Sequence, residues 1–391
     1  MFEAREGVAL ETSCANGSLL TPAMSDPWNA PGVYRLLAAS LFDPSSPMKL
    51  HPAAIPSLLK WGVRFLRNST LARYRAATRS NYRLARYSVE RTRELRDRLG
   101  LQYDAAAVGS MKLFRCRASF ERSLALARLL EPLGLRCEVL DRDGAVSMEP
   151  ALLSIREQIV SALRFPDDEC GDARKFCEAL AQVLPLTGGT LLTGTRVSAL
   201  AVENGRAIGV ITDKGLHRAA AVVAAAGNAT PRLVRPLGIS LAIRPVKGYT
   251  VTIDASRVEG RPLIPVIDDD SHAAVVPIGT RLRVAGTAEF AGMDTTLREE
   301  RIAALHTLLA TVYPAIAQSI DHANVEKWAA LRPVSADGLP FIGATRVRNL
   351  FVNAGHGHLG WTLAVGSAHL VADAITGERS AIDPAAYCAN R

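Results

Sequence analysis

The sequence of 391 residues lacks several features that would assign it to a class of protein. Its six cysteines are scattered and form no C-x-x-C, so neither a zinc site nor a disulfide framework is indicated, and reduced, cytoplasmic thiols are expected. No apolar run approaches about 18 residues, and the N-terminus has no charged-then-apolar signal pattern. We therefore expect neither a membrane span nor secretion. No internal repeat or low-complexity tract is visible.

The composition is that of a globular protein with a sizeable core. Apolar residues make up 48% of the chain and charged residues 21%, and the length is sufficient for two domains. The net charge is +8, and arginine is much commoner than lysine. This balance favours anionic partners such as phosphates, carboxylates or acidic lipid.

The basic excess is concentrated between Lys60 and Arg98, where arginines are interleaved with aromatic residues. An ordinary solvated helix face, a nucleic-acid face and a membrane-surface contact are all compatible with this pattern. We favour the solvated face over nucleic acid, expect no nucleic-acid partner, and keep the membrane contact open.

Strands of two kinds alternate along the chain and predict an α/β fold that crosses between domains more than once. Residues 221–226 predict a wholly buried strand that stops at Gly227, and a long helix is expected from about Leu71 to Leu99. The segments "IRPVKGYTVTID" and "RLRVAGTAEFAGMD" predict strands of a second sheet.

A G-x-G-x-x-G occurs once, in "NAGHGHLGWT" at residues 353–362. The local pattern predicts a strand, a turn and a helix. As a first phosphate loop the match is weak, because no second parallel strand is predicted after the helix. The pattern still indicates a helix N-terminus with free N–H groups and a positive dipole end.

Eight segments, taken in their order, make the sequence similar to a known family. The chain resembles the D-amino acid dehydrogenase branch of the FAD-dependent amine and amino-acid oxidoreductases, which also include glycine and sarcosine oxidases. The resemblance covers nearly the whole chain. Its carriers are "EAREGVALETSCANG" with "PWNAPGV", "FPDDECGDARKFCEALA", "VVAAAGNAT", "RPVKGYTVTI", "RVAGTAEFAGMDT", "ALRPVSADGLPFIG" and "GHGHLGWTLAVGS".

The resemblance implies a Rossmann-like FAD-binding domain (residues 1–40, 150–230 and 330–391) interleaved with an antiparallel-sheet substrate domain (residues 41–149 and 231–329). The family's phosphate loop lies on a unit of roughly 25 to 30 residues ahead of the position of Glu3, and this first βα unit is missing from the chain. We therefore expect this chain to bind FAD poorly or not at all, and its parallel sheet to be without the strand that pairs with residues 221–226.

The resemblance also assigns residues to the cofactor. Glu3 matches the acid that binds the adenosine ribose, Val197 a backbone contact to adenine, and Gly227 a close approach to the nucleotide. A surface acid and a core valine are the alternatives for the first two. The other matches are Ser13, Asn16 and Gly17 along the pyrophosphate and ring, and Gly357, Leu359, Gly360, Trp361 and Thr362 at the pyrimidine edge, where a helix dipole stabilises developing negative charge.

Three residues are assigned to the substrate. Arg332 matches the arginine that grips a substrate carboxylate; a structural ion pair with Asp337 is the alternative. Tyr249 is expected to donate its hydroxyl to the same carboxylate or to be an ordinary strand aromatic. His356, like His358, is expected to form hydrogen bonds or shape the pocket rather than to act as a base. We expect no metal site.

The activity implied is FAD-dependent oxidative deamination of D-amino acids to 2-oxo acids and ammonia. Electrons are expected to pass to a quinone or another respiratory acceptor. The expected location is the cytoplasm, with peripheral contact to the cytoplasmic face of the inner membrane. Two alternatives are an N-terminally truncated or non-catalytic homologue with an interaction role, and an oxygen-using oxidase of the glycine or sarcosine type.

Overall fold

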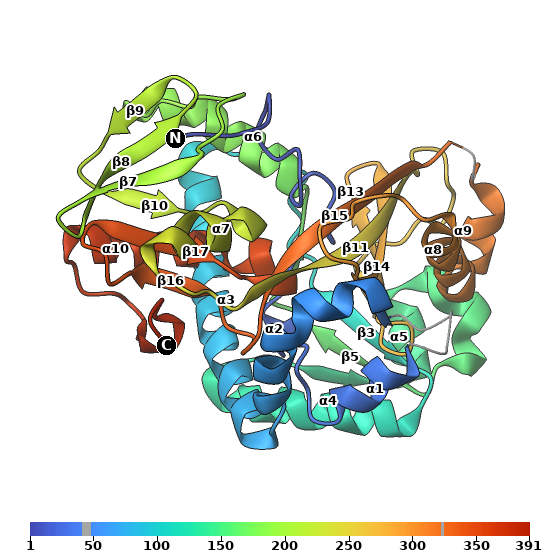
Figure 1. Ribbon diagram of the computed structural model, residues 1–391. Helices are drawn as coiled ribbons and strands as arrows, with labels where there is room; N and C mark the ends of the chain where they lie inside the picture. Colours follow the sequence, from blue (N-terminus) through green and yellow to red (C-terminus); the bar gives the residue numbers. More distant parts are fainter. Residues whose placement is uncertain (41–47, 322–323) are drawn as a thin grey trace.

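The computed structural model of the chain describes residues 1–40, 48–321 and 324–391. Helices and strands are mixed along these ranges, so the predicted α/β class is confirmed (Figure 1). None of the helices in these ranges is long and apolar enough to cross a membrane. The α-helices are α1 (Val33–Ala39), α2 (Ile55–Arg67), α3 (Leu71–Leu99), α4 (Arg117–Leu130), α5 (Arg142–Met148), α6 (Ala173–Val183), α7 (Thr230–Val234), α8 (Glu299–Val312), α9 (Pro314–Ser319) and α10 (Gly360–Thr376).

The largest sheet forms the core of one half of the molecule. Its strands lie in the order β15, β11, β14, β13, β12, β3, β5 and β4, and β2 also pairs with β14. Most neighbouring strands are antiparallel, in agreement with the predicted substrate sheet. The strands are β2 (Met48–Leu50), β3 (Ser110–Phe114), β4 (Glu138–Leu140), β5 (Ser161–Phe165), β11 (Ile243–Asp254), β12 (Val266–Asp268), β13 (Ala273–Ile278), β14 (Arg281–Phe290) and β15 (Glu326–Ser335).

Strand β11 divides this half into a core face and an open face, because successive side chains of a strand point to opposite sides. Tyr249, Val251 and Ile253 belong to a buried cluster that includes the apolar face of α8. Gly248 and Thr250 point the other way and line a large cavity. One strand therefore supports both the core and the wall of the cavity.

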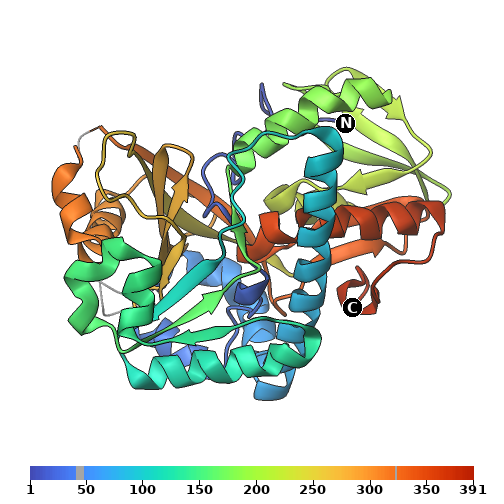
Figure 2. The ribbon, with the colours of Figure 1, turned by 180° about the vertical axis from the view of Figure 1, so that it is seen from behind.

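The other half of the molecule has three layers. The parallel strands β10 (Val222–Ala224) and β17 (Leu350–Ala354), extended by the antiparallel β16 (Phe341–Ala344), form the middle layer. Helix α10 covers one face, and α3 packs on α10 from outside (Figure 2). The other face is covered by the antiparallel strands β7 (Ala199–Glu203), β8 (Arg206–Thr212) and β9 (Gly215–Arg218). A separate short pair joins β1 (Leu19–Leu20) to β6 (Glu169–Cys170).

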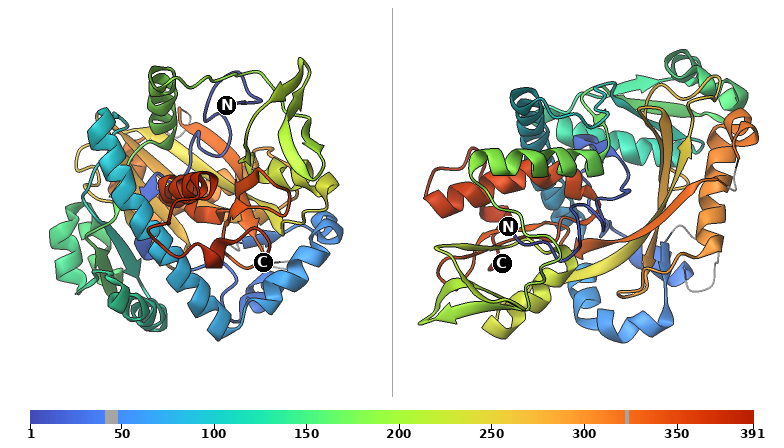
Figure 3. Two further views of the ribbon diagram at one scale, coloured as in Figure 1. Left: turned by 90° about the vertical axis from the view of Figure 1, so that its left-hand side faces the viewer. Right: turned by 90° about the horizontal axis from the view of Figure 1, so that it is seen from above.

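Both ends of the chain belong to this layered half (Figure 3). Phe2 forms an isolated parallel bridge with Leu192, and β17 and α10 come from the C-terminal end. The long helix α3, whose predicted bounds are confirmed, comes from the first third of the chain and packs against α10. The half is therefore assembled from segments far apart in sequence.

The contact between α3 and α10 requires a glycine. The N–H of Gly366 donates to Ser88 Oγ at 2.9 Å. A β-carbon at position 366 would lie 2.7 Å from the Ser88 β-carbon and 2.9 Å from its Cα. These separations are shorter than van der Waals contact, so only glycine allows the two helices to approach this closely.

Two expectations about the strands need correction. Strand β10 covers Val222–Ala224 only, and Val223 is 40% exposed, so residues 221–226 are not a wholly buried strand. The reason is that β17 is its only ladder partner in the described part of the chain, while its other edge borders the cavity. In addition, β5 pairs with β3 and β4 in the large sheet, although it lies in a range assigned to the FAD-binding domain. The other domain boundaries stay predictions; residues 41–47 and 322–323, which they include, lie outside the described residues.

Replacing Gly366 by alanine should lower the free energy of unfolding by about 1–3 kcal/mol, because the added methyl group overpacks the contact with α3. Gly62 in α2 is the matched control, since no heavy atom of the described residues beyond the helix backbone lies within 4 Å of a β-carbon built there. Gly62→Ala should raise the stability by up to about 1 kcal/mol through helix propensity. Urea unfolding measures both variants. A Gly366→Ala midpoint equal to that of the unmodified chain would contradict the close contact.

Candidate functional site

A cavity of about 2420 Å³ lies between the large sheet and the layered half of the molecule. Its wall is formed by the N-terminal segment, β10 and the turn after it, the start of α10, and residues of β11, β14 and β15. Ligand pockets usually measure about 300–1,000 Å³. This cavity therefore has room for a ligand of dinucleotide size and a second, smaller molecule.

The N-terminal segment and β10 bring together the residues assigned to the nucleotide. Glu3, Val197 and Gly227 all line the cavity. The backbone of Glu3 is fixed, because its N–H donates to Leu192 O at 2.9 Å and its carbonyl accepts from the Thr195 N–H at 2.8 Å. Its carboxylate accepts the Arg5 N–H at 2.8 Å. A carboxylate held in this way at the cavity wall is suited to accept hydroxyl groups of a sugar.

The turn that contains Ser13, Asn16 and Gly17 also lines the cavity, and strands of the large sheet hold it in place. Thr250 Oγ1 in β11 donates to Ala15 O at 2.9 Å. The buried side chain of Arg283 in β14 donates to Asn16 O at 3.3 Å, and its pKa is lowered by burial. No pattern in the sequence distinguishes Arg283, which is one of many arginines and occupies an ordinary strand position.

The start of α10 points its first turn at the cavity. Gly357, Leu359, Gly360, Trp361 and Thr362 all line it. The Thr362 hydroxyl anchors this turn, because it accepts the N–H of residue 21 at 3.1 Å. The first N–H groups of a helix have no partner within the helix and form its positive end. This end of the cavity is therefore suited to partial negative charge.

Arg332 provides the cation of the site. It projects from β15, and its Nη1 donates to the carbonyl of Thr287 at 3.1 Å. The guanidinium carbon lies 5.6 Å from the ring centre of Trp28. Burial lowers the pKa of Arg332 to about 10. The group has no carboxylate partner among the described residues, and the alternative partner, Asp337, instead binds Arg391 at 2.7 Å.

A bulge and a glycine make room for this guanidinium. Between the pairs Lys247–Glu289 and Tyr249–Gly286, strand β14 contains one residue more than β11. The extra residue belongs to a bulge in which Thr287 has φ of 60°, and its carbonyl meets Arg332. A β-carbon at Gly248 would lie 1.9 Å from Arg332 Nη1. The glycine within the strand pattern "KGYTV" was the available signal for such a close approach.

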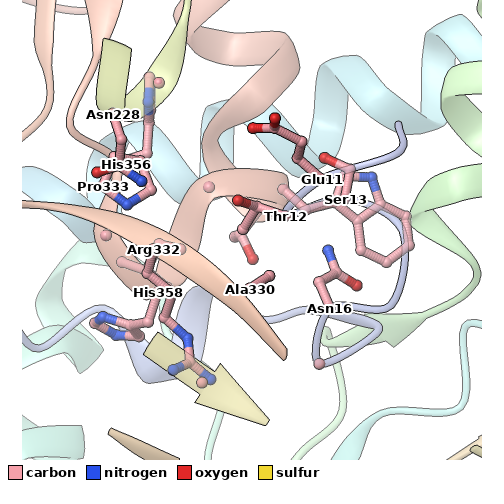
Figure 4. A pocket seen from close by; sticks show the side chains of 18 of the residues that line it. Glu11, Thr12, Ser13, Asn16, Asn228, Ala330, Arg332, Pro333, His356 and His358 are labelled. Atoms are coloured by element: carbon pink, nitrogen blue, oxygen red, sulfur yellow. The ribbon is translucent and has the colours of Figure 1, made fainter. Parts of the chain in front are cut away.

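The two histidines of the cavity are partly buried and neutral. His356 Nε2 lies 3.1 Å from Ser367 Oγ in α10, and burial lowers the His356 pKa to about 4. His358 Nε2 lies 3.2 Å from Met24 O, and its ring stacks on Trp28 with centroids 5.4 Å apart. Burial also lowers the His358 pKa. Arg332, His356 and His358 lie on one side of the cavity, opposite Thr12, Ser13 and Asn16 (Figure 4).

Several polar atoms of the wall have unused hydrogen-bonding capacity. Four are buried and have no partner within the described part of the chain: Thr287 Oγ1, Asn228 Oδ1, Trp328 Nε1 and Trp361 Nε1. A buried polar group without a partner costs about 1–3 kcal/mol. The wall thus offers both donors and acceptors to a ligand. With the volume and the helix start, these groups fit the predicted cofactor, FAD.

Tyr249 is not part of this site and is corrected here. It is fully buried in the cluster under α8, and its hydroxyl donates to Glu289 Oε2 at 2.7 Å. Glu289 also binds Lys247 at 3.0 Å, so the tyrosine belongs to a buried polar group on the far face of β11. The structure therefore agrees with the alternative, an ordinary strand aromatic, because Tyr249 and Gly248 are neighbours in sequence but point to opposite faces of the sheet.

Known proteins share this arrangement over almost the whole chain. Residues 1–374 match the family described as FAD dependent oxidoreductase. The D-amino acid dehydrogenase of Methylobacterium radiotolerans is 40% identical over 378 residues, which cover 96% of this chain and 90% of that protein. The D-amino acid dehydrogenase of Agrobacterium fabrum is 38% identical over 383 residues, 98% of this chain and 91% of that protein. The crystal structure of glycine oxidase from Geobacillus kaustophilus has a TM-score of 0.75 and 25% identity, covering 100% of this chain and 91% of that one.

The neutral state of His356 predicts a specific pH dependence. Its folded pKa of about 4 lies below the value of about 6.5 expected in the unfolded chain. As pH falls from about 6.5 to about 4, the unfolded chain binds a proton that the folded chain does not, so folding stability is lost in this window and retained above it. His356→Gln should reduce the stability lost between about pH 7 and about pH 5 by about 2 kcal/mol. Urea unfolding at the two pH values tests this, and equal losses in both proteins would contradict a buried neutral imidazole.

Proposed function

The chain belongs to the family of FAD-dependent oxidoreductases, and on this basis we propose that it oxidises D-amino acids to 2-oxo acids and ammonia. The observation that carries the proposal is the partly buried guanidinium of Arg332, which faces the cavity without a carboxylate partner among the described residues. An α-amino acid supplies the missing anion. The D-amino acid dehydrogenases that are similar over nearly the whole chain support the choice of substrate class.

Three segments of the cavity wall would each hold a different part of the cofactor. Glu3, Val197 and Gly227 would hold the adenosine part, and the turn at Ser13 and Asn16, with Gly17, would lie along the pyrophosphate and the ring. Residues 357–362, which form a 3-10 turn (Gly357–Leu359) and the start of α10, would donate N–H groups to the ring's polar edge. When bound, FAD supplies a two-electron acceptor for the hydrogen on the substrate's α carbon.

The protein's own residues bind and orient the substrate. The guanidinium of Arg332 forms two parallel charge-assisted hydrogen bonds with a carboxylate, which fixes the α carbon in one orientation. Because His356 and His358 are neutral, they add no positive charge beside the substrate's amine, which must lose its proton before oxidation. Water then converts the imino acid to the 2-oxo acid and ammonia outside the redox step.

For the electron acceptor we propose a quinone or another respiratory carrier, reached through peripheral contact with a membrane. The names of the similar dehydrogenases favour an acceptor other than oxygen. The glycine oxidase with the same fold favours the alternative, an oxygen-using oxidase. Turnover with a D-amino acid that forms peroxide faster than it reduces a quinone analogue would support the oxidase.

Arg332→Ala should lower kcat/KM for D-amino acids by about 100-fold or more, because two charge-assisted hydrogen bonds are lost. The kcat/KM of Arg332→Lys should lie between that of Arg332→Ala and that of the unmodified chain, since an ammonium group does not reproduce the paired geometry. Arg391→Ala is the control and should keep its activity, because Arg391 binds Asp337 and does not line the cavity. Reduction of a soluble dye by the flavin-loaded protein measures all three.

An unchanged kcat/KM in Arg332→Ala would remove this arginine from the substrate site. A flavin-loaded chain that reduces no dye with any D-amino acid would instead favour the non-catalytic alternative. The visible absorption band of the flavin, measured on each variant, separates loss of cofactor from loss of substrate binding.

Gly248→Ala should lower kcat/KM by roughly ten-fold or more, because the new methyl group displaces the Arg332 guanidinium. In an Arg332→Ala background the same change should have little further effect, since the two residues act as a unit. The four proteins form a double-mutant cycle measured by dye reduction. Additive losses would show that Gly248 acts independently of Arg332.

A further inference from the structure

The two residues that flank Gly248 in β11 are held together on the core side of the large sheet. The Tyr249 hydroxyl donates to Glu289 Oε2 at 2.7 Å, and Lys247 Nζ lies 3.0 Å from the same oxygen. The side chains of Lys247 and Glu289 are 0% and 1% exposed. One carboxylate of β14 thus binds both neighbours of one glycine in β11. We call Lys247, Tyr249 and Glu289 the core clamp.

The charged groups of the core clamp are satisfied by further partners. Lys247 Nζ also donates to Asp294 Oδ2 at 2.9 Å and to Thr296 O at 3.1 Å, so its three N–H groups have three acceptors. Glu289 Oε1 lies 2.6 Å from His51 Nε2. Burial raises the pKa of Glu289, but the hydrogen bonds that the carboxylate accepts outweigh this effect and hold the pKa below its ordinary value. The core clamp is therefore an ionised pair in a fixed geometry.

The core clamp also fixes the bulge of β14. Glu289 ends the bulge and pairs with Lys247, so two residues of β14 lie opposite Gly248 alone. One of the two is Thr287, whose φ is 60° and whose carbonyl accepts Arg332 Nη1 at 3.1 Å. The clamp thus holds, from the core side, the carbonyl that the guanidinium meets on the cavity side.

The Arg332 guanidinium occupies the space above Gly248. A β-carbon on this glycine would lie 1.9 Å from Nη1, 2.2 Å from Cζ and 2.3 Å from Nη2 of Arg332. The β11 backbone at this point is therefore the surface on which the charge rests, and the core clamp holds it on both sides. Since a misplacement of about 1 Å in a site can cost about 100-fold in rate, the position of this short segment matters for substrate binding.

We propose that the core clamp positions the guanidinium of Arg332 for the substrate's carboxylate, by fixing the β11 backbone beneath it and the β14 carbonyl beside it. Lys247, Tyr249 and Glu289 do not line the cavity, so they act through Arg332 and do not touch the substrate. The inference rests on the proposed function in that it takes Arg332 as the group that binds the carboxylate.

The test is calorimetric titration of the full chain, with FAD present, with propionate, which carries the acid group of a substrate but no amine to oxidise. Glu289→Gln keeps the size of the side chain and removes its charge, so the buried Lys247 ammonium loses one partner. We expect the Kd for propionate to rise by roughly ten-fold or more, because the guanidinium is misplaced. In an Arg332→Ala background the same change should add less than about two-fold, since the two residues act as a unit.

The matched control is Glu169→Gln. The Glu169 side chain is also 1% exposed and lies between two cations, Arg93 and Arg96, and none of the three lines the cavity. This variant should lose stability in urea unfolding but keep the Kd for propionate within about two-fold. Tyr249→Phe is a milder change of the core clamp, and the loss of its one hydrogen bond should raise the Kd by about three-fold.

An unchanged Kd in Glu289→Gln would overturn the proposal. An equal rise in Glu169→Gln would overturn it too, because the effect would then follow from general destabilisation, and so would an additive loss in the Arg332→Ala background. If Glu289→Gln does not fold, Tyr249→Phe decides by the same criteria. Propionate binding that depends on Glu289 and Arg332, in a chain that oxidises no D-amino acid, would contradict the proposed function and leave the core clamp supported.

Discussion

The arrangement of the cavity depends on one partly buried positive charge, that of Arg332, which no carboxylate of the described residues neutralises. A guanidinium in a low-dielectric site is costly unless an anion meets it, and the lowered pKa of Arg332 reflects that cost. The wall offers it a carbonyl and an aromatic face, from Thr287 and Trp28, but no carboxylate among the described residues. The protein thus holds a positive charge without a carboxylate partner among the described residues, which is the condition that the proposed binding of a substrate's acid group requires.

The large sheet is distorted where it holds this charge. The bulge in β14 gives Thr287 a left-handed backbone and turns its carbonyl toward Arg332, while Gly248 leaves the space that a side chain would fill. Such local strain is stable only where surrounding packing determines it, and here the opposite face of β11 is fixed by the cluster under α8. The rigid core on one face therefore sets the position of the charge on the other.

The parts of the structure that depend on motifs and periodicity could be predicted from the sequence. The parts that depend on the direction in which a side chain points could not. The α/β class, the bounds of α3 and the helix after "GHGHLG" were predictable from periodicity and glycine spacing. The resemblance left two roles open for Tyr249, a substrate contact or an ordinary strand aromatic, and the alternation of side chains along β11 decides for the second. The role of Arg283, and the exposure of β10, depend on which segments become neighbours in space, and residue patterns along the chain do not encode that.

The positive charge of Arg332 and the surface cations of α2 and the start of α3 act independently, because solvent and salt screen them to different extents. The charge of Arg332 acts inside the cavity, where few ions screen it, so a carboxylate bound there should be little affected by salt. The cations of α2 and the start of α3 act through water, where screening reduces their attraction beyond about 8 Å at physiological ionic strength. A surface contact held by these cations can form and break while the substrate site keeps its geometry.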